Sequence, residues 1–247
     1  MKTLKKYINE SIWDIEDNVE DNNEESIKND IYKFLDEFYF CEEKNNFKEP
    51  SQIVQIILDK NQFIVNCHCT VHGRVNLTSL TNGMFKWGEV KDFVCSGSSK
   101  LKSLEGAPEY VGGNFNCGFC VNLKNLEGAP KEVKGLFNCN LCGKLESLEG
   151  APKEVGGGFH CRYCSKLESL KGAPKIVGGD FDCLNCPIES LEGAPERVGG
   201  DFDCRECYEL ESLKGAPKYV KGKFRCAGCE KLTPKAIRDA KKQIKKA

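Results

Sequence analysis

The sequence predicts a repeat solenoid of short parallel β-strands whose convex side is extended rather than helical. A motif, Phe-x-Cys-x-x-Cys, recurs along the chain, and the phrase Leu-x-x-Leu-x-Gly-Ala-Pro-x-x-Val lies between successive copies of it. No segment between the motifs is long enough, or free enough of Gly and Pro, to form a helix. A fixed period of about 22 residues is typical of solenoids. The motif itself, Phe-x-Cys-x-x-Cys, begins at Phe115, Phe137, Phe159, Phe181, Phe202 and Phe224.

The Phe-x-Cys segment of each copy is the predicted strand, one in each coil. Phe and the first Cys are two residues apart, so their side chains share one face of a strand. The second Cys can also face inward only if the chain turns before it. Gly pairs before the strand permit tight bends, and Gly-Ala-Pro after it favours an extended return. The predicted strands are Phe115–Cys117, Phe137–Cys139, Phe159–Cys161, Phe181–Cys183, Phe202–Cys204 and Phe224–Cys226.

The chain before the solenoid divides into two predicted parts. Residues 1–50 form a helical, acidic segment with seven Lys and fourteen Asp or Glu (7 − 14 = −7). Helices are predicted at about 3–16 and 24–42, with a solvated acidic linker around 14–25. Residues 51–89 form a β-rich cap, because two β-prone runs flank an Asp-Lys-Asn turn.

The solenoid itself is assigned to residues 90–232, including a degraded first copy around Phe93 and Cys95. Residues 233–247 then form a basic capping helix, and residues 231–247 carry seven Lys or Arg and one Asp (7 − 1 = +6). Thr233 is its predicted N-cap, and Pro234 suits the first helical position. An open solenoid needs such atypical ends to cover its last apolar layers.

The repeat resembles the leucine-rich repeat, LxxLxLxxN/CxL, with Phe and the first Cys in the strand and the second Cys at the Asn/Cys position. The Leu-x-Ser-Leu-x-x-x-Pro phrase is especially similar to the short, proline-marked repeats of bacterial effector proteins. The resemblance covers the six copies of the motif and implies a concave binding face with an extended convex side. Phe-Cys-Cys in place of Leu-Leu-Asn puts the usual asparagine hydrogen-bond ladder in doubt.

The cysteines allow two interpretations. Two Cys-x-x-Cys pairs can surround a zinc ion with four thiolates. Here, however, each pair lies within an apolar pattern, and a buried cysteine behaves as a small hydrophobic residue. We therefore expect a buried, reduced thiol ladder without a cofactor, and zinc binding is the alternative. The zinc ligands would be Cys117, Cys120, Cys139, Cys142, Cys161 and Cys164.

The sequence offers little for catalysis. It contains no phosphate-binding loop, nucleophile elbow or dinucleotide fingerprint, so we expect no enzyme and no catalytic residues. A metal site at Cys67, His68, Cys69 and His72 would be divided between two faces of a strand. An effector activity within the N-terminal segment, targeted by the repeats, is a further alternative.

The expected function is protein–protein interaction through the concave face of the solenoid. Neighbouring coils lie about 4.8 Å apart, so Phe119, Leu141 and Tyr163 would stack into an exposed apolar stripe. An alternative is that the rings of Phe119 and Tyr163 fold over the coil edge into the core. The remaining candidate contacts are charged or polar: His160, Arg162, Asp182, Asp203 and Arg205.

Composition bears on the partner and the compartment. A net charge of −1 makes nucleic acid an unexpected partner, and no apolar run approaches the roughly 20 residues of a membrane span. Sixteen cysteines without a secretory signal favour reducing cytoplasm.

The first ten residues are similar to the capsid-targeting leaders of internal head proteins of large tailed phages. Those leaders end at Ile/Leu-x-Glu, which Ile8-Asn9-Glu10 matches; an ordinary amphipathic helix is the alternative. The layout also looks like that of leucine-rich-repeat proteins from phages of gut bacteria. The resemblance implies a bacterial or phage protein in the host cytoplasm, with the virion interior as the alternative.

Overall fold

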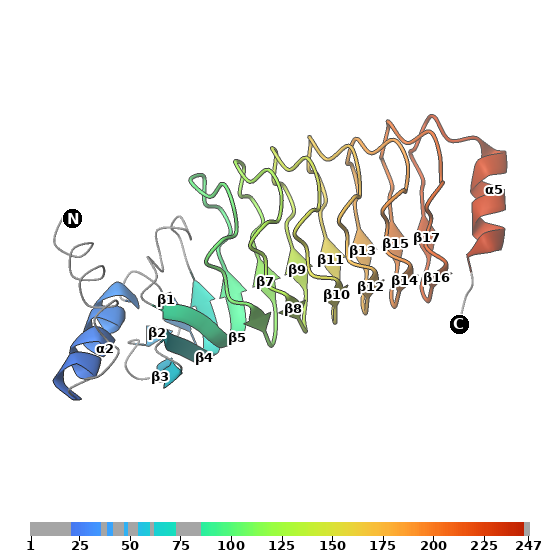
Figure 1. Ribbon diagram of the computed structural model, residues 1–247. Coiled ribbons are helices and arrows are strands. Elements are labelled where there is room, and N and C mark those ends of the chain that lie inside the picture. Colours follow the sequence, from blue (N-terminus) through green and yellow to red (C-terminus); the bar gives the residue numbers. More distant parts are fainter. Residues whose placement is uncertain are drawn as a thin grey trace.

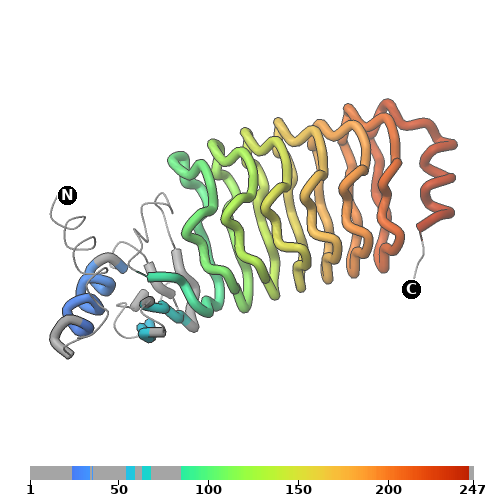
Figure 2. Tube along the Cα trace, in the orientation of Figure 1, coloured from blue at the N-terminus to red at the C-terminus, as the bar shows by residue number. Residues whose placement is uncertain are grey.

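The computed structural model describes residues 21–35, 39–41, 47–48, 54–59, 62–72 and 85–244. These residues form an elongated parallel β-solenoid, with a described helix and a group of strands toward its N-terminal end and a described helix at its C-terminal end (Figures 1 and 2). The predicted fold class is therefore confirmed. The predicted helix over 3–16, the leader at residues 1–10 and the side chains of His68, Cys69 and His72 lie outside the described residues.

The N-terminal part differs from the prediction in its boundaries. Helix α2 (Asp21–Leu35) begins inside the predicted linker, and strand β1 (Tyr39–Cys41) replaces the predicted last helical turn. β1 pairs with β2 (Phe47–Lys48) and β4 (Gln62–His72). The β-rich cap therefore begins near residue 39, because cross-strand pairing outweighs the helical spacing of the apolar residues there.

The predicted hairpin around the Asp-Lys-Asn turn is confirmed. Strand β3 (Val54–Asp59) pairs antiparallel with β4 (Gln62–His72). β4 also pairs in parallel with β5 (Phe85–Val94), which begins the parallel stack. The solenoid thus starts at Phe85, five residues before the predicted boundary, and the hairpin covers its first strand.

Each later coil contains two short strands, whereas the sequence predicted one. β5 pairs with both β6 (Tyr110–Val111) and β7 (Phe115–Asn116), so its single ten-residue strand gives rise to two parallel ladders. One ladder continues through β8 (Glu132–Val133), β10 (Glu154–Val155), β12 (Ile176–Val177), β14 (Arg197–Val198) and β16 (Tyr219–Val220). The predicted Phe ladder continues through β9 (Phe137–Asn138), β11 (Phe159–His160), β13 (Phe181–Asp182), β15 (Phe202–Asp203) and β17 (Phe224–Arg225).

Glycine separates the two strands of each coil. A Cβ at Gly157 would lie 2.6 Å from the carbonyl carbon of Gly135 in the coil before it. No side chain fits such a contact, so the backbones of successive coils approach closely only because these positions are Gly. The same corner in every coil allows Gly157 N to donate to Gly135 O at 3.0 Å.

A stack of phenylalanine rings runs through the core. The rings of Phe137 and Phe159 are 5.0 Å apart, those of Phe159 and Phe181 are 5.7 Å apart, and both pairs are nearly parallel. These rings are fully buried. Val, Leu and both cysteines of each coil complete the same continuous core. The repeated apolar residues thus bury one face of each short strand against the next coil.

The convex side consists of turns rather than helices, as predicted. Gly150 has φ +91°, and a Cβ there would lie 2.4 Å from the amide nitrogen of Glu127 in the coil before it. Ala151 N donates to Leu148 O at 3.0 Å, which closes the turn. Gly of the Gly-Ala-Pro phrase therefore provides both the left-handed conformation and the close approach.

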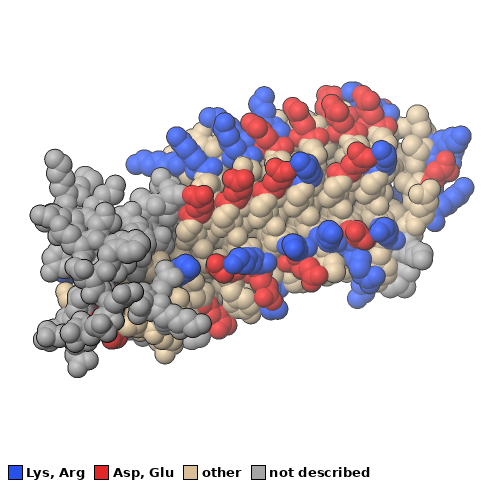
Figure 3. All heavy atoms as spheres, in the orientation of Figure 1, with Lys and Arg blue, Asp and Glu red and all other residues tan. Residues whose placement is uncertain are grey.

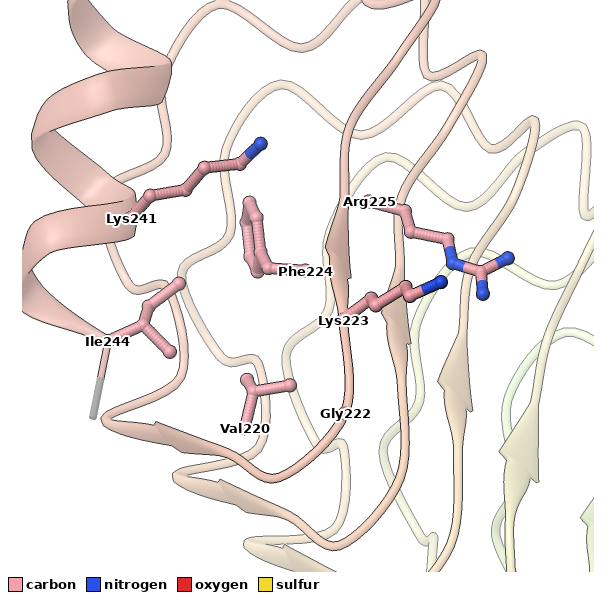
Figure 4. A pocket seen from close by; sticks show the side chains of 7 residues that line it. All are labelled: Val220, Gly222, Lys223, Phe224, Arg225, Lys241 and Ile244. Atoms are coloured by element: carbon pink, nitrogen blue, oxygen red, sulfur yellow. The ribbon is translucent and has the colours of Figure 1, made fainter. Parts of the chain in front are cut away.

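Helix α5 (Pro234–Gln243) closes the C-terminal end, as the sequence predicts. Thr233 is the N-cap, and its side chain accepts a hydrogen bond from Ala236 N at 3.1 Å. Figure 4 shows Lys241 and Ile244 lying on the helix side of Phe224, the last ring of the stack, whereas Arg225 points away. A hollow of about 400 Å³ remains beneath the helix.

Candidate functional site

The turn after each Phe strand is built by a short polar side chain. Asn116 Oδ1 accepts a hydrogen bond from Gly118 N at 3.0 Å, and Asn138 Oδ1 accepts one from Asn140 N at the same distance. Asp182 does the same for Leu184 N. Such Asx turns reverse the chain within two residues, and this lets the second Cys face inward beside the first.

The next residue in each turn has a left-handed backbone. Phe119, Leu141 and Tyr163 have φ of 61°, 60° and 56°, whereas the equivalent positions at the two ends of the solenoid are Gly97 and Gly228. For a bulky residue this conformation costs about 1–3 kcal/mol. The coil geometry thus imposes a left-handed backbone at a position where glycine would have the least conformational strain. The central coils nevertheless carry large apolar residues there.

Backbone hydrogen bonds align these turn residues from coil to coil. Phe119 N donates to Asn140 O at 2.8 Å, Leu141 N to Arg162 O at 2.8 Å, and Tyr163 N to Leu184 O at 2.9 Å. Residues at the same place in successive coils therefore lie side by side along the solenoid. Phe119, Leu141 and Tyr163 form one row.

The row is exposed, so the alternative that Phe119 and Tyr163 pack into the core is wrong. The exposed fractions are 58% for Phe119, 38% for Leu141 and 46% for Tyr163. Two further exposed apolar residues, Val121 (46%) and Tyr208 (48%), each follow the second Cys of a coil. The sequence prediction missed both, because it sought outward-facing residues between Phe and the second Cys and not beyond that Cys. We call these five residues the apolar ridge.

The charged candidates beside the ridge are largely engaged with one another. Arg162 forms an ion pair with Asp182 at 2.6 Å, and Arg205 binds both carboxylate oxygens of Asp203. Asp182 and Asp203 are only 4% and 5% exposed, which differs from their predicted role as surface contacts. A short acidic side chain folds back to cap its own turn, so it cannot reach a partner as well. The two arginine side chains remain 41% exposed.

His160 occupies the same strand position as the capping Asn and Asp residues. It is half-buried, and burial together with the nearby Arg162 lowers the pKa of its imidazole. The neutral form is therefore favoured at neutral pH. The coils before His160 carry the amides Asn116 and Asn138 at this position. The charged residues of this surface begin at Arg162, so the neutral ring lies between an amide-rich part and a charged part.

Coil stacking also organises the outer surface. Glutamates pair with lysines of the following coil, as in Glu109–Lys131 (2.7 Å) and Glu149–Lys171 (2.8 Å). Figure 3 shows the result on one face, where rows of charged side chains follow the long axis with an uncharged band between two of them. These pairs are exposed and contribute little stability each.

The second cysteine of each coil forms a thiol ladder. Cys164 Sγ donates to the backbone oxygen of Cys139 at 3.3 Å, and Cys142 Sγ donates to that of Cys117 at the same distance. Both cysteines of every Cys-x-x-Cys pair are free and buried. The thiol thus bridges successive coils through a backbone carbonyl, the kind of contact that the sequence analysis left in doubt for a Cys in place of Asn.

Burial also controls the chemistry of cysteines in the central coils. It raises the pKa of Cys117, Cys139 and Cys142, with the neighbouring repeat cysteines adding to the effect. A thiol in such surroundings stays protonated and is a poor nucleophile or metal ligand. Among the described side chains, no group of three or more His, Cys, Asp or Glu is arranged to hold a metal ion.

Comparison of the chain with known protein families, with curated proteins and with solved structures returned no match. In the part of the chain that the structure describes, no helix is long and apolar enough to cross a membrane. The candidate site therefore depends on the geometry of the ridge itself.

Proposed function

We propose that the protein is a non-enzymatic interaction module that binds another protein through the apolar ridge. The observation that carries this proposal is the position of Phe119, Leu141 and Tyr163, which are exposed and left-handed at once. Each property alone has a free-energy cost in the isolated protein. The coil geometry requires the left-handed backbone but not a bulky apolar side chain on it, since Gly97 and Gly228 occupy the same position in the end coils. Contiguous exposed apolar patches mark interaction surfaces.

The surroundings of the ridge also suit a protein partner. Asn116, Asn138 and Asn140 use their side-chain oxygens to accept backbone hydrogen bonds. Their amide NH₂ groups, which make no hydrogen bond to the described residues, remain as donors beside Phe119 and Leu141. Apolar anchors next to free donors can bind the side chains and backbone carbonyls of a partner. The free thiols fit a reducing compartment such as bacterial cytoplasm.

Substitution at Tyr163 tests the proposal. We expect Tyr163→Ala to weaken binding of a partner captured from the native host by about 2 kcal/mol or more, as loss of an aromatic anchor does. The melting temperature should change little, because the ring is half-exposed. Leu141→Gly should also weaken binding while leaving stability unchanged or higher, since Gly relieves the left-handed strain.

The matched controls are Glu149→Ala and Lys153→Ala, which change exposed residues of the Gly-Ala-Pro side. Both variants should bind and melt like the unmodified protein. Normal binding by Tyr163→Ala, together with weakened binding by either control, would place the binding surface elsewhere. A sharp fall in the melting temperature of Tyr163→Ala would show that the Tyr163 ring stabilises the fold.

A further inference from the structure

One coil of the solenoid is shorter than the others, and the difference lies at its surface. The step from Phe181 to Phe202 is one residue shorter than every other step between successive copies of the motif. Only Pro187 separates Cys186 from the next core residue, Ile188, where other coils have two residues. Ile188 is still fully buried, so the missing residue is removed from the exterior and leaves a hollow of about 360 Å³.

Two aromatic residues from the neighbouring coils line this hollow. Tyr163 comes from the coil before the short one and Tyr208 from the coil after it, and Pro187 lies in the coil between them. Both rings are close to half-exposed. The volume is at the small end of the roughly 300–1,000 Å³ of ligand pockets, which suits a single side chain rather than a larger molecule.

The hollow also carries negative charge. Glu206 and Glu209 line it with Asn185 and Ser165. Glu209 is paired with Lys231 at 2.8 Å. Glu206 forms no ion pair with the described residues: Arg205 interacts with it only electrostatically, because that guanidinium is bound to Asp203. The Glu206 carboxylate accepts a hydrogen bond from the Asn185 amide at 3.5 Å. Like Phe119, Leu141 and Tyr163, Glu206 is exposed and left-handed, with φ 57°.

Aromatic faces beside an unpaired carboxylate are suited to a cation. A planar guanidinium can stack on a tyrosine ring and donate to a carboxylate at the same time. An anionic ligand would be repelled by Glu206, and a purely apolar one would leave Glu206 unpaired. We propose that this hollow binds an arginine side chain of the partner protein, with Tyr163 and Tyr208 as its walls and Glu206 as its counter-ion.

This inference rests on the proposed function, because Tyr163 and Tyr208 belong to the apolar ridge and the arginine belongs to the bound protein. The two can be tested apart. A small arginine probe reports on the hollow without any partner, whereas Leu141→Gly tests the ridge without changing a residue that lines the hollow. Failure of one experiment therefore leaves the other interpretable.

The experiment is a ¹⁹F NMR titration of the full chain labelled with 3-fluorotyrosine, with signals assigned by Tyr163→Phe and Tyr208→Phe. N-acetyl-arginine amide should shift both signals in a saturable manner. N-acetyl-citrulline amide, its neutral isostere, should bind at least about fivefold more weakly, because the cation–π and ionic contacts are lost.

Glu206→Gln should weaken binding of the arginine probe by about fivefold or more. Glu168→Gln, a control at another exposed glutamate, should leave the affinity for the probe unchanged. Equal binding of citrulline and arginine would overturn the proposal. Unchanged binding by a folded Glu206→Gln variant, or the absence of any saturable shift, would also overturn it.

Discussion

Replacing Phe159 by alanine should lower the free energy of unfolding by about 3–5 kcal/mol, the usual cost of removing a buried aromatic ring. Phe159 is fully buried and stacks on rings from the coils on both sides, 5.0 Å from Phe137 and 5.7 Å from Phe181. Because coils contact only their neighbours, the cavity would weaken two inter-coil interfaces. Denaturant unfolding followed by circular dichroism measures the change.

Phe224→Ala is the matched control for this substitution. Phe224 is the last ring of the stack, is partly exposed and has one stacked neighbour, Phe202, at 5.2 Å. Its loss should therefore cost clearly less than the loss of Phe159. Equal losses for the two variants would show that the ring stack does not hold the coils together.

The protein should lose stability steeply in alkaline solution under reducing conditions. Burial raises the pKa of Cys117, Cys139 and Cys142 in the folded chain, whereas thiols of the unfolded chain ionise near pH 8.5. Above that pH the unfolded state releases protons that the folded state retains. Above that pH, each such thiol lowers the free energy of unfolding by about 1.4 kcal/mol per pH unit. The three thiols together lower it by about 4 kcal/mol per pH unit.

The measurement is denaturant unfolding between pH 7.5 and about pH 10 in the presence of a phosphine reductant. Stability from these thiols should be complete below about pH 8.5 and decline above it. In the Cys117→Ala/Cys139→Ala variant the decline should be shallower by about 2.7 kcal/mol per pH unit, because two of the ionising groups are gone. Parallel pH profiles for the two proteins would contradict the assignment of protonated, buried thiols.

The sequence was sufficient to predict the Phe ladder and the buried cysteines. Phe159 and Cys161 share a face by strand alternation alone, and the fixed period places each coil over the one before it. The exposed row was predictable for a related reason. Tyr163 lies between a polar turn residue and an inward Cys164, so its side chain has no core to enter.

The second strand ladder was not predictable from side-chain periodicity. Its strands are two residues long, and only one residue of each, such as Val155 in β10, faces the core. The ladder forms because glycines such as Gly157 let successive backbones approach. That contact depends on the stacking of coils, which a single copy of the repeat does not reveal.

The burial of Asp182 and Asp203 also could not be predicted from the sequence. An acidic residue in an exposed strand is expected to reach solvent, but here each carboxylate caps a turn and meets an arginine. The shortened coil was visible in the sequence. Its consequence, a hollow between Tyr163 and Tyr208, appeared only when the coils were stacked.

Site-specific photocrosslinking tests the role of the apolar ridge most directly. Leu141 and Ile176 are equally exposed, at 38%, but Ile176 lies on β12 in the other strand ladder. With p-benzoylphenylalanine at each position in turn, we expect a discrete protein adduct in the native host at position 141 and none at position 176. Adding Tyr163→Ala should reduce the adduct at position 141. An adduct at position 176 with none at position 141 would contradict binding through the ridge.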